Sequence, residues 1–279
     1  MKELDFDLSR MASRGQLFPD GIERDPWVLF HGTHGVWESE IESSGLTPGV
    51  LHDEKFKYNL SKLSSLNDVI MDINSIRPQR AGKSTHILSS YSLEDIAAGC
   101  PICLSTFSSE STKYAHPENL GGEVMSGFCN AYSYIIEIIT GFQEGSSGTL
   151  PPVEDWPDEV FRAALWFKEN EPWASKLYSS LMKLQAMNGY STVYALKFTE
   201  HTILEMENTE ADEVKCFRTI KPEEIISKIQ IPNSFFEEYS KDPRMRAFLE
   251  DREFERKVLD EKRKGVLKAI RENKKLRDG

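Results

Sequence analysis

The stretch VLFHGTH at residues 28–34 is an apolar run that ends in His-Gly-Thr. Such a run predicts a buried strand. The strand would bring His31 and Gly32 to one point, where an imidazole stands beside backbone that no side chain covers. The apolar residues that follow are spaced as in a helix, and this pattern ends at Gly45, because glycine is typical of helix C-termini. The predicted order is therefore a strand, a ligand-binding turn and a short helix, although His31 also fits a strand-end histidine bonded to backbone.

A second element occupies residues 101–116, with the sequence PICLSTFSSESTKYAH. Its apolar start predicts a short strand, which leads into Ser108 and Ser109, and either serine is a typical helix N-cap. Tyr114 then lies on the predicted helix beside Glu110 and Ser111. A tyrosine in this place can stack on a ligand, or it can be an ordinary half-buried packing residue.

A third element begins with the acidic sequence EADE at residues 210–213. The residues that follow, 214–220, alternate in polarity and predict a strand, and a helix or turn opens at 221–226. A glutamate is therefore placed at the start of a late strand. Glu213 is the first candidate, Glu210 the second and Glu207 the third, while solvated surface is the alternative for all of them.

In this order the three elements resemble the ADP-ribosyltransferases with the His-Tyr-Glu type of site, the group of poly(ADP-ribose) polymerases and diphtheria toxin. The resemblance extends over residues 27–231, and its specificity rests on the three short elements. It implies an α+β fold with split, mostly antiparallel sheets around an NAD cleft, helical insertions and a C-terminal helix.

The resemblance also implies roles for six residues toward NAD. Breaking the nicotinamide glycosidic bond generates a ribosyl cation, so a carboxylate near the ribose stabilises the developing charge. The backbone of a glycine is open to the carboxamide, and an aromatic ring stacks on the nicotinamide. The expected catalytic residues are Glu213, His31 and Tyr114, and the expected NAD-binding residues are His31, Gly32, Thr33, Ser105 and Tyr114.

Two departures from the family pattern bear on the reaction. Cys103 stands where the polymerases have the tyrosine of the triad, which disfavours chain formation and favours transfer of a single ADP-ribose. Residues 105–107, Ser-Thr-Phe, are similar to the Ser-Thr-Ser strand of the arginine-modifying branch. The function predicted is mono-ADP-ribosylation of a protein or nucleic-acid acceptor, in a toxin or in conflict with phages. NAD glycohydrolysis and a noncatalytic binding module are the alternatives.

The composition predicts a globular, cytoplasmic protein without a membrane segment. Of the 279 residues, 39% are hydrophobic and 28% charged, and four cysteines are too few for a disulfide scaffold. The net charge of −11 is unevenly distributed, because residues 241–279 hold 14 Lys and Arg against 9 Asp and Glu. The acidic remainder of the chain disfavours general binding of nucleic acid.

The expected organisation has three parts: a leader at 1–26, a catalytic domain at 27–235 and a charged helical extension at 236–279. A helical insertion at about 120–190 is predicted within the catalytic domain. A mobile loop around 77–83, inside the polar segment 51–92, is predicted to cover the NAD cleft. The extension either packs on its own domain or binds an inhibitor, a chaperone or an anionic substrate.

The pair Cys100 and Cys103 also suggests a zinc or redox site. Zinc needs two more ligands, which His116 and Cys129 supply only at an unusual spacing. A redox pair belongs at a helix N-terminus, whereas these cysteines lead into a predicted strand. Ordinary packing is the favoured interpretation, and no metal is expected.

Overall fold

The structure is a computed structural model that describes residues 1–49, 58, 100–117, 125, 128–129, 132–133, 136, 158–187, 189–208, 213–239, 252–262 and 264–278. The chain divides into two compact units. The first comprises Met1–Gly49, Gly99–Gly121 and Gln185–Gly279, and the second comprises Val50–Ala98 and Gly122–Leu184. The predicted loop at 77–83 lies outside the described residues.

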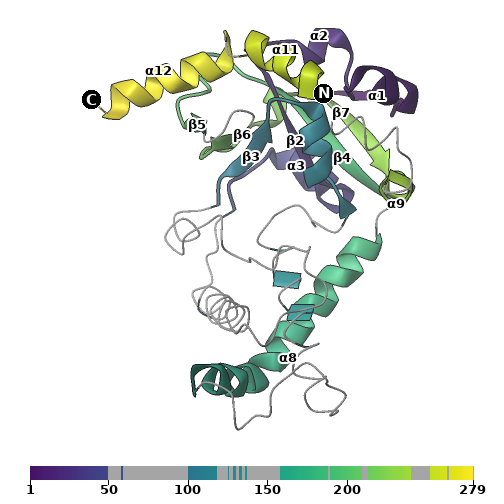
Figure 1. The fold of residues 1–279 in the computed structure, drawn as a ribbon, viewed down its shortest axis with the longest axis vertical. Helices are drawn as coiled ribbons and strands as arrows, with labels where there is room; N and C mark the ends of the chain where they lie inside the picture. The colour runs from purple at the N-terminus through teal and green to yellow at the C-terminus, as the bar shows by residue number, and fades with distance from the viewer. Residues whose placement is uncertain are drawn as a thin grey trace. The chain divides into compact units, whose positions relative to one another are not determined.

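The first unit is built on a seven-stranded sheet with the order β1-β7-β4-β2-β3-β6-β5 (Figure 1). The β1 to β7 pairing is parallel and every other pairing is antiparallel. The predicted mixture of helices with a mostly antiparallel sheet is therefore confirmed, but these strands form one sheet. The strands are β1 (Lys2–Leu4), β2 (Val28–His34), β3 (Ile102–Ser105), β4 (Tyr190–Lys197), β5 (Met206–Asn208), β6 (Glu213–Cys216) and β7 (Ile225–Pro232).

The sheet is narrowly joined at its middle. Strand β2 pairs with β4 at seven positions, from Val28 to His34, yet it pairs with β3 only at Phe30 and Ser105. On the other side β3 pairs with β6 at four positions. One cross-strand pair thus connects a four-strand half to a three-strand half.

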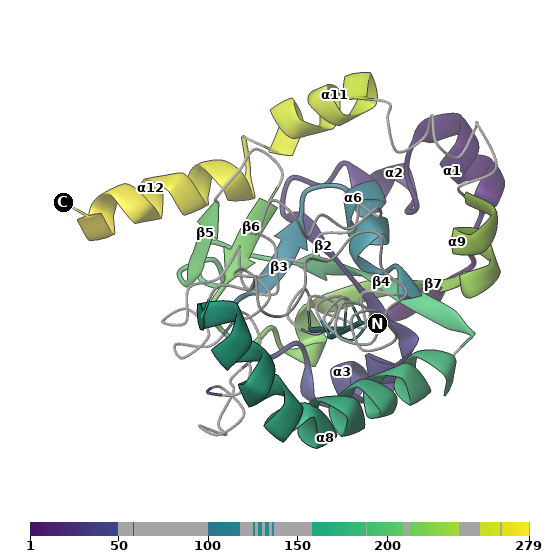
Figure 2. The same ribbon diagram turned by 60° about the horizontal axis from the view of Figure 1, so that its bottom comes forward.

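Helices cover both faces of this sheet (Figure 2). Strand alternation sends Leu29 to one face and Phe30 to the other, and the buried apolar residues form a separate cluster on each face. Residues 1–26 contribute β1, α1 and α2 to this unit. Among the described residues, the helical elements of the unit are α1 (Leu8–Arg14), α2 (Asp20–Glu23), η1 (Gly35–Trp37), α3 (Glu38–Ser44), α6 (Ser108–Tyr114), η4 (Pro222–Glu224), α9 (Asn233–Tyr239), α11 (Arg252–Lys262) and α12 (Val266–Asp278).

The two predicted helix ends have different outcomes. Gly45 follows α3 with φ +83°, as the predicted C-terminal glycine requires. The predicted N-caps Ser108 and Ser109 are wrong, because both lie inside α6 and its N-cap is Phe107, without a side-chain cap bond. The backbone N–H of Ser108 is instead bound by a side chain from a distant segment, the carboxylate of Glu23.

Helix α8 (Asp158–Met187) accounts for most of the described part of the second unit. It bends along its length (Figure 2) and contains Pro172, which lacks the N–H that a helix interior uses. Tyr132 contacts the rings of Phe167 and Tyr178 on this helix. Among the described residues, no helix combines the length and apolar composition that crossing a membrane requires.

A buried lysine from α11 crosses the narrow junction of the sheet. The Nζ of Lys262 donates to the carbonyl of Val28, 2.9 Å away, and to the carbonyl of Thr106. Val28 opens β2 and Thr106 follows β3, so one ammonium group holds both strands beside their only pair. The same Nζ lies 4.4 Å from the ring centroid of Phe30, within cation–π range.

The countercharge comes from Glu23 at the end of α2, which is fully buried. Its Oε1 accepts from the backbone N–H and the hydroxyl of Ser108, at 3.1 and 2.9 Å. Burial lowers the pKa of Lys262 to about 8, although the charges of Glu23 and Asp25 oppose that shift. Figures 1 and 2 both show α11 near α2. An early helix, α2, and a late helix, α11, therefore both contribute a buried charge to the sheet junction.

Replacement of Lys262 by Met should lower the free energy of unfolding by about 3 kcal/mol, because it leaves the buried charge of Glu23 without compensation. Denaturant unfolding measures this loss. The exposed neighbour Lys264 offers a matched control, and Lys264→Met should change stability by less than about 0.5 kcal/mol. The double variant Glu23→Gln/Lys262→Met should recover part of the loss. Equal stability of wild type and Lys262→Met would contradict this role.

Candidate functional site

The structure brings the three predicted elements together at the junction of β2, β3 and β6. Phe30 of β2 is paired with Ser105 of β3, and Ser105 is paired with Glu213 of β6. His31 directly follows Phe30. Residues 31, 105 and 213 are far apart in the sequence. The pairing of β2 with β3 and of β3 with β6 brings them to adjacent positions in the sheet.

His31 links β2 to β3 beyond their single pair. Its Nδ1 lies 2.9 Å from the carbonyl oxygen of Cys103, which only accepts, so Nδ1 carries the proton. Burial lowers the pKa of His31, against the raising effect of this bond, so the imidazole is neutral at pH 7. Its Nε2 then presents a lone pair, which can accept a hydrogen bond from a hydroxyl group.

The predicted ligand-binding turn at Gly32 is wrong, because β2 continues to His34 and stays paired with β4 there. Gly32 is in close contact with the backbone of α6. A β-carbon at this position would lie 1.7 Å from the carbonyl oxygen of Ser111, so no other residue fits without movement. Ser111 is 1% exposed, and within the described part of the chain its hydroxyl has no hydrogen-bond partner. Leaving a buried hydroxyl without a hydrogen-bond partner is energetically costly.

Ser105 and Glu213 face each other across β3 and β6. The hydroxyl oxygen of Ser105 accepts from the N–H of Phe107 at 3.1 Å, so this predicted ligand residue also shapes the turn before α6. Glu213 is the first residue of β6, as predicted, and is half-buried. Strand alternation places both side chains on the face of Phe30, opposite to that of His31. The His31 ring nevertheless bonds to the backbone of β3, at the point where β2 and β3 are no longer paired.

The other predicted residues lie around this junction. Thr33 is buried and opposite Thr192 on β4, and Tyr114 is the last residue of α6, with 36% of its surface exposed. Glu207 lies on β5, one strand farther from Ser105 than Glu213 is. Glu210 lies outside the described residues. The register therefore favours Glu213 over Glu207.

A polar network fixes the segment that follows β2. Lys228 of β7 binds Glu38 and Glu42 of α3 and also Glu3 of β1. Burial disfavours the charge of Lys228, but the hydrogen bonds to these glutamates raise its pKa. Glu38 accepts in addition from the hydroxyl of Thr192 at 2.8 Å. Helix α3 is thereby attached to β4 and β7.

Sequence reasoning placed Ser111 beside Tyr114 but gave it no role, and it missed Glu23 and Lys262. Ser111 lies three residues before Tyr114, on the same predicted helix, and its helical position was the available signal. Glu23 and Lys262 carried no local signal, because each resembles a solvated charge until the fold buries it.

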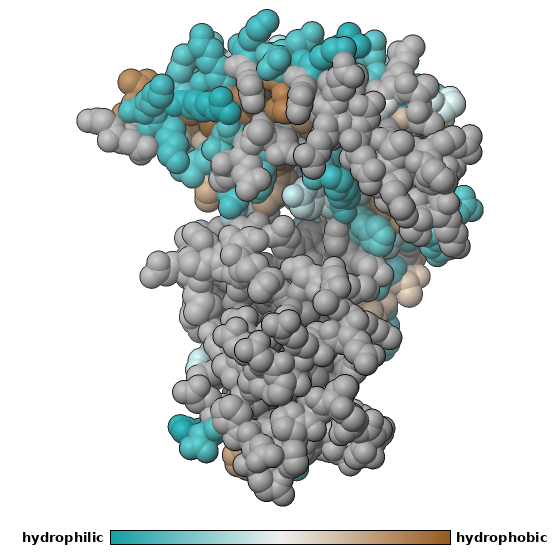
Figure 3. All heavy atoms as spheres, in the orientation of Figure 1, coloured by the Kyte–Doolittle hydropathy of each residue, from teal (hydrophilic) through white to brown (hydrophobic). Residues whose placement is uncertain are grey.

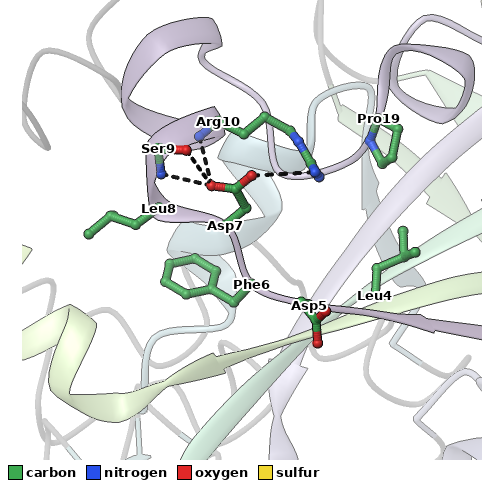
Figure 4. A pocket seen from close by; sticks show the side chains of 8 residues that line it. All are labelled: Leu4, Asp5, Phe6, Asp7, Leu8, Ser9, Arg10 and Pro19. Atoms are coloured by element: carbon green, nitrogen blue, oxygen red, sulfur yellow. Dashed lines mark hydrogen bonds and ion pairs between the residues drawn. The ribbon is translucent and has the colours of Figure 1, made fainter.

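A hollow of about 590 Å³ lies elsewhere in the first unit (Figure 4). It is lined by residues 4–10 and Pro19, and the Asp7 carboxylate in it accepts from the N–H groups of Ser9 and Arg10. These bonds cap α1, so the polar groups already serve the helix. None of the predicted site residues lines this hollow.

Comparison with known proteins gives no relative for the chain. No family model matches it, and no curated protein and no solved structure matches it significantly.

Gly32→Ala should destabilise the protein by about 1–3 kcal/mol, because the added methyl group meets the Ser111 carbonyl. Thermal unfolding measures the effect. The matched control is Gly21→Ala, since a β-carbon at Gly21 meets nothing within 4 Å. A Gly32→Ala melting temperature equal to that of Gly21→Ala would show that α6 does not pack on β2 in this way.

His31 should make the protein less stable as the pH falls below 6.5. Burial lowers the pKa of His31, so below pH 6.5 the unfolded chain binds a proton at this residue more readily than the folded chain does. The contribution of neutral His31 to the free energy of unfolding is fully present above pH 6.5. It is lost as the pH falls through the lowered pKa of the folded chain. Unfolding of wild type and His31→Gln at pH 7.5 and 5.5 measures it, and wild type should lose more stability. The same loss in both proteins would refute the assignment.

Proposed function

We propose that the protein is an NAD-dependent mono-ADP-ribosyltransferase that acts at the junction of β2, β3 and β6. The observation that carries the proposal is the register Phe30–Ser105–Glu213 beside the bond from His31 to the Cys103 carbonyl. It places the Glu213 carboxylate of β6 near the part of β2 that carries the neutral imidazole of His31 and the adjacent Gly32.

NAD fits the groups at this junction. Ser111 supplies a buried hydroxyl without a partner among the described residues, and its backbone carbonyl packs against Gly32. A carboxamide has one acceptor oxygen and two N–H donors, so it can pair with this hydroxyl and with glycine backbone. Tyr114, on the same helix and partly exposed, offers a ring face for nicotinamide. The Nε2 of His31 accepts from a ribose hydroxyl.

In the proposed reaction the bond between the nicotinamide nitrogen and ribose C1′ breaks, and its electron pair goes to the nitrogen. The ribose becomes cationic, and the Glu213 carboxylate stabilises that charge and holds the 2′-hydroxyl. A nucleophilic group of the acceptor then bonds to C1′ and loses its proton. Water in place of the acceptor gives hydrolysis to ADP-ribose.

Glu213→Gln tests this role against a matched control. Glutamine keeps the shape but removes the charge, so we expect kcat to fall about 100-fold or more while KM for NAD stays within about threefold. Glu207→Gln, on the neighbouring strand β5, should keep wild-type kcat. The measurement is release of labelled nicotinamide from NAD by the purified chain.

Three outcomes would contradict the proposal. Full activity of Glu213→Gln removes that residue from the chemistry, and loss of activity in Glu207→Gln alone moves the carboxylate to β5. A wild-type chain that turns over no NAD, with protein, nucleic acid and water all present as acceptors, is not this enzyme.

A further inference from the structure

Helix α12 joins the sheet through one face and presents positive charge on another. Val266, Leu267 and Ile270 are buried in the core. Lys268, Arg271 and Lys275 follow a spacing of three and four residues, so they lie along one side of the helix, and all three are exposed. Together these three residues form a basic stripe. Hydrophilic residues predominate over the α12 region in Figure 3.

The basic stripe is connected to the candidate site by side-chain hydrogen bonds. Nε and Nη2 of Arg271 both donate to Oδ1 of Asn208, at 3.0 and 2.8 Å. Nδ2 of Asn208 donates to the backbone carbonyl of Glu213 at 2.8 Å. One asparagine on β5 thus separates the stripe from the backbone of the proposed catalytic glutamate.

The charge of α12 contrasts with that of the remainder of the chain. The helix has five Lys and Arg against Glu272 and Asp278, whereas the whole protein has a net charge of −11. Glu272 lies 3.8 Å from Lys268, but both side chains are more than half exposed, so this pair is weak in water. A polyanion is repelled by most of the chain and attracted at this helix.

We propose that the basic stripe binds the phosphodiester backbone of a nucleic acid, which is the acceptor for ADP-ribose. Cationic side chains spaced along one helix face match phosphates along a strand, and such contacts depend on charge and not on base sequence. The Arg271–Asn208 link then fixes Glu213 relative to the bound strand. The assignment as acceptor rests on the proposed function, whereas the binding of nucleic acid does not.

The test is fluorescence anisotropy with a labelled single-stranded oligonucleotide of mixed sequence and the full chain at low salt. Lys268→Gln/Lys275→Gln should weaken binding about tenfold and make its salt dependence shallower, by about 0.7 per lost phosphate contact in a plot of log K against log salt. Arg271 stays intact, so the link to Asn208 is preserved. The matched control is Lys176→Gln/Lys183→Gln, two exposed lysines of α8 at the same seven-residue spacing, which should bind as wild type does.

A second readout separates this proposal from the proposed function. Transfer of label from NAD to the oligonucleotide should decrease in Lys268→Gln/Lys275→Gln, while nicotinamide release with water as the acceptor stays at the wild-type rate. Oligonucleotide binding without any NAD turnover would refute the proposed transferase activity but support the proposal that the basic stripe binds nucleic acid.

The binding proposal is overturned by any of three results. These are no oligonucleotide binding at low salt, equal weakening by both double variants, or unchanged binding in Lys268→Gln/Lys275→Gln. Binding of the stripe to a polyglutamate probe but not to the oligonucleotide would assign it to an acidic protein instead.

Discussion

The structure depends on one buried charge, the Lys262 ammonium, which bonds to the carbonyls of Val28 and Thr106. A charged group is costly to bury, and here Glu23 and two carbonyl oxygens compensate for the lost water. The buried lysine lies where the sheet is weakest, because Phe30 and Ser105 form the only pair between β2 and β3. The hydrogen bonds of Lys262 therefore join β2 and β3 where strand pairing joins them at a single position.

This arrangement explains how β2 and β3 keep fixed positions where their backbones are no longer paired. Where β2 and β3 separate, the imidazole of His31 bonds to β3, and α6 packs on Gly32. Glu23 holds the first residue of α6, and that helix carries Ser111 and Tyr114. Backbone groups beside the junction are thus held by side chains, and Gly32 and Ser111 lie in the contact between β2 and α6. Such a preorganised polar site is what the proposed transfer reaction requires.

Local patterns in the sequence predicted a good part of this. The apolar run before His31, the capping glycine at 45 and the glutamate that opens β6 are each signalled by neighbouring residues, and each lies on the expected element. Long-range partners could not be predicted in the same way. Ser108 looked like an N-cap because its hydroxyl suits that role, but Glu23, 85 residues away, binds it instead. Lys262 looked like one more charge on a solvated helix, and strand register, which brings Ser105 beside Glu213, depends on the whole sheet.

Hydrogen–deuterium exchange with and without NAD shows whether NAD binds where β2, β3 and β6 meet. The amides of 28–34, 102–117 and 213–216 should exchange more slowly with NAD bound, since ligand contacts hold these segments closed. Peptides from α12 should change little in the absence of an acceptor. Protection confined to residues 4–10, which line the separate hollow, or no protection of any segment at millimolar NAD, would contradict the account.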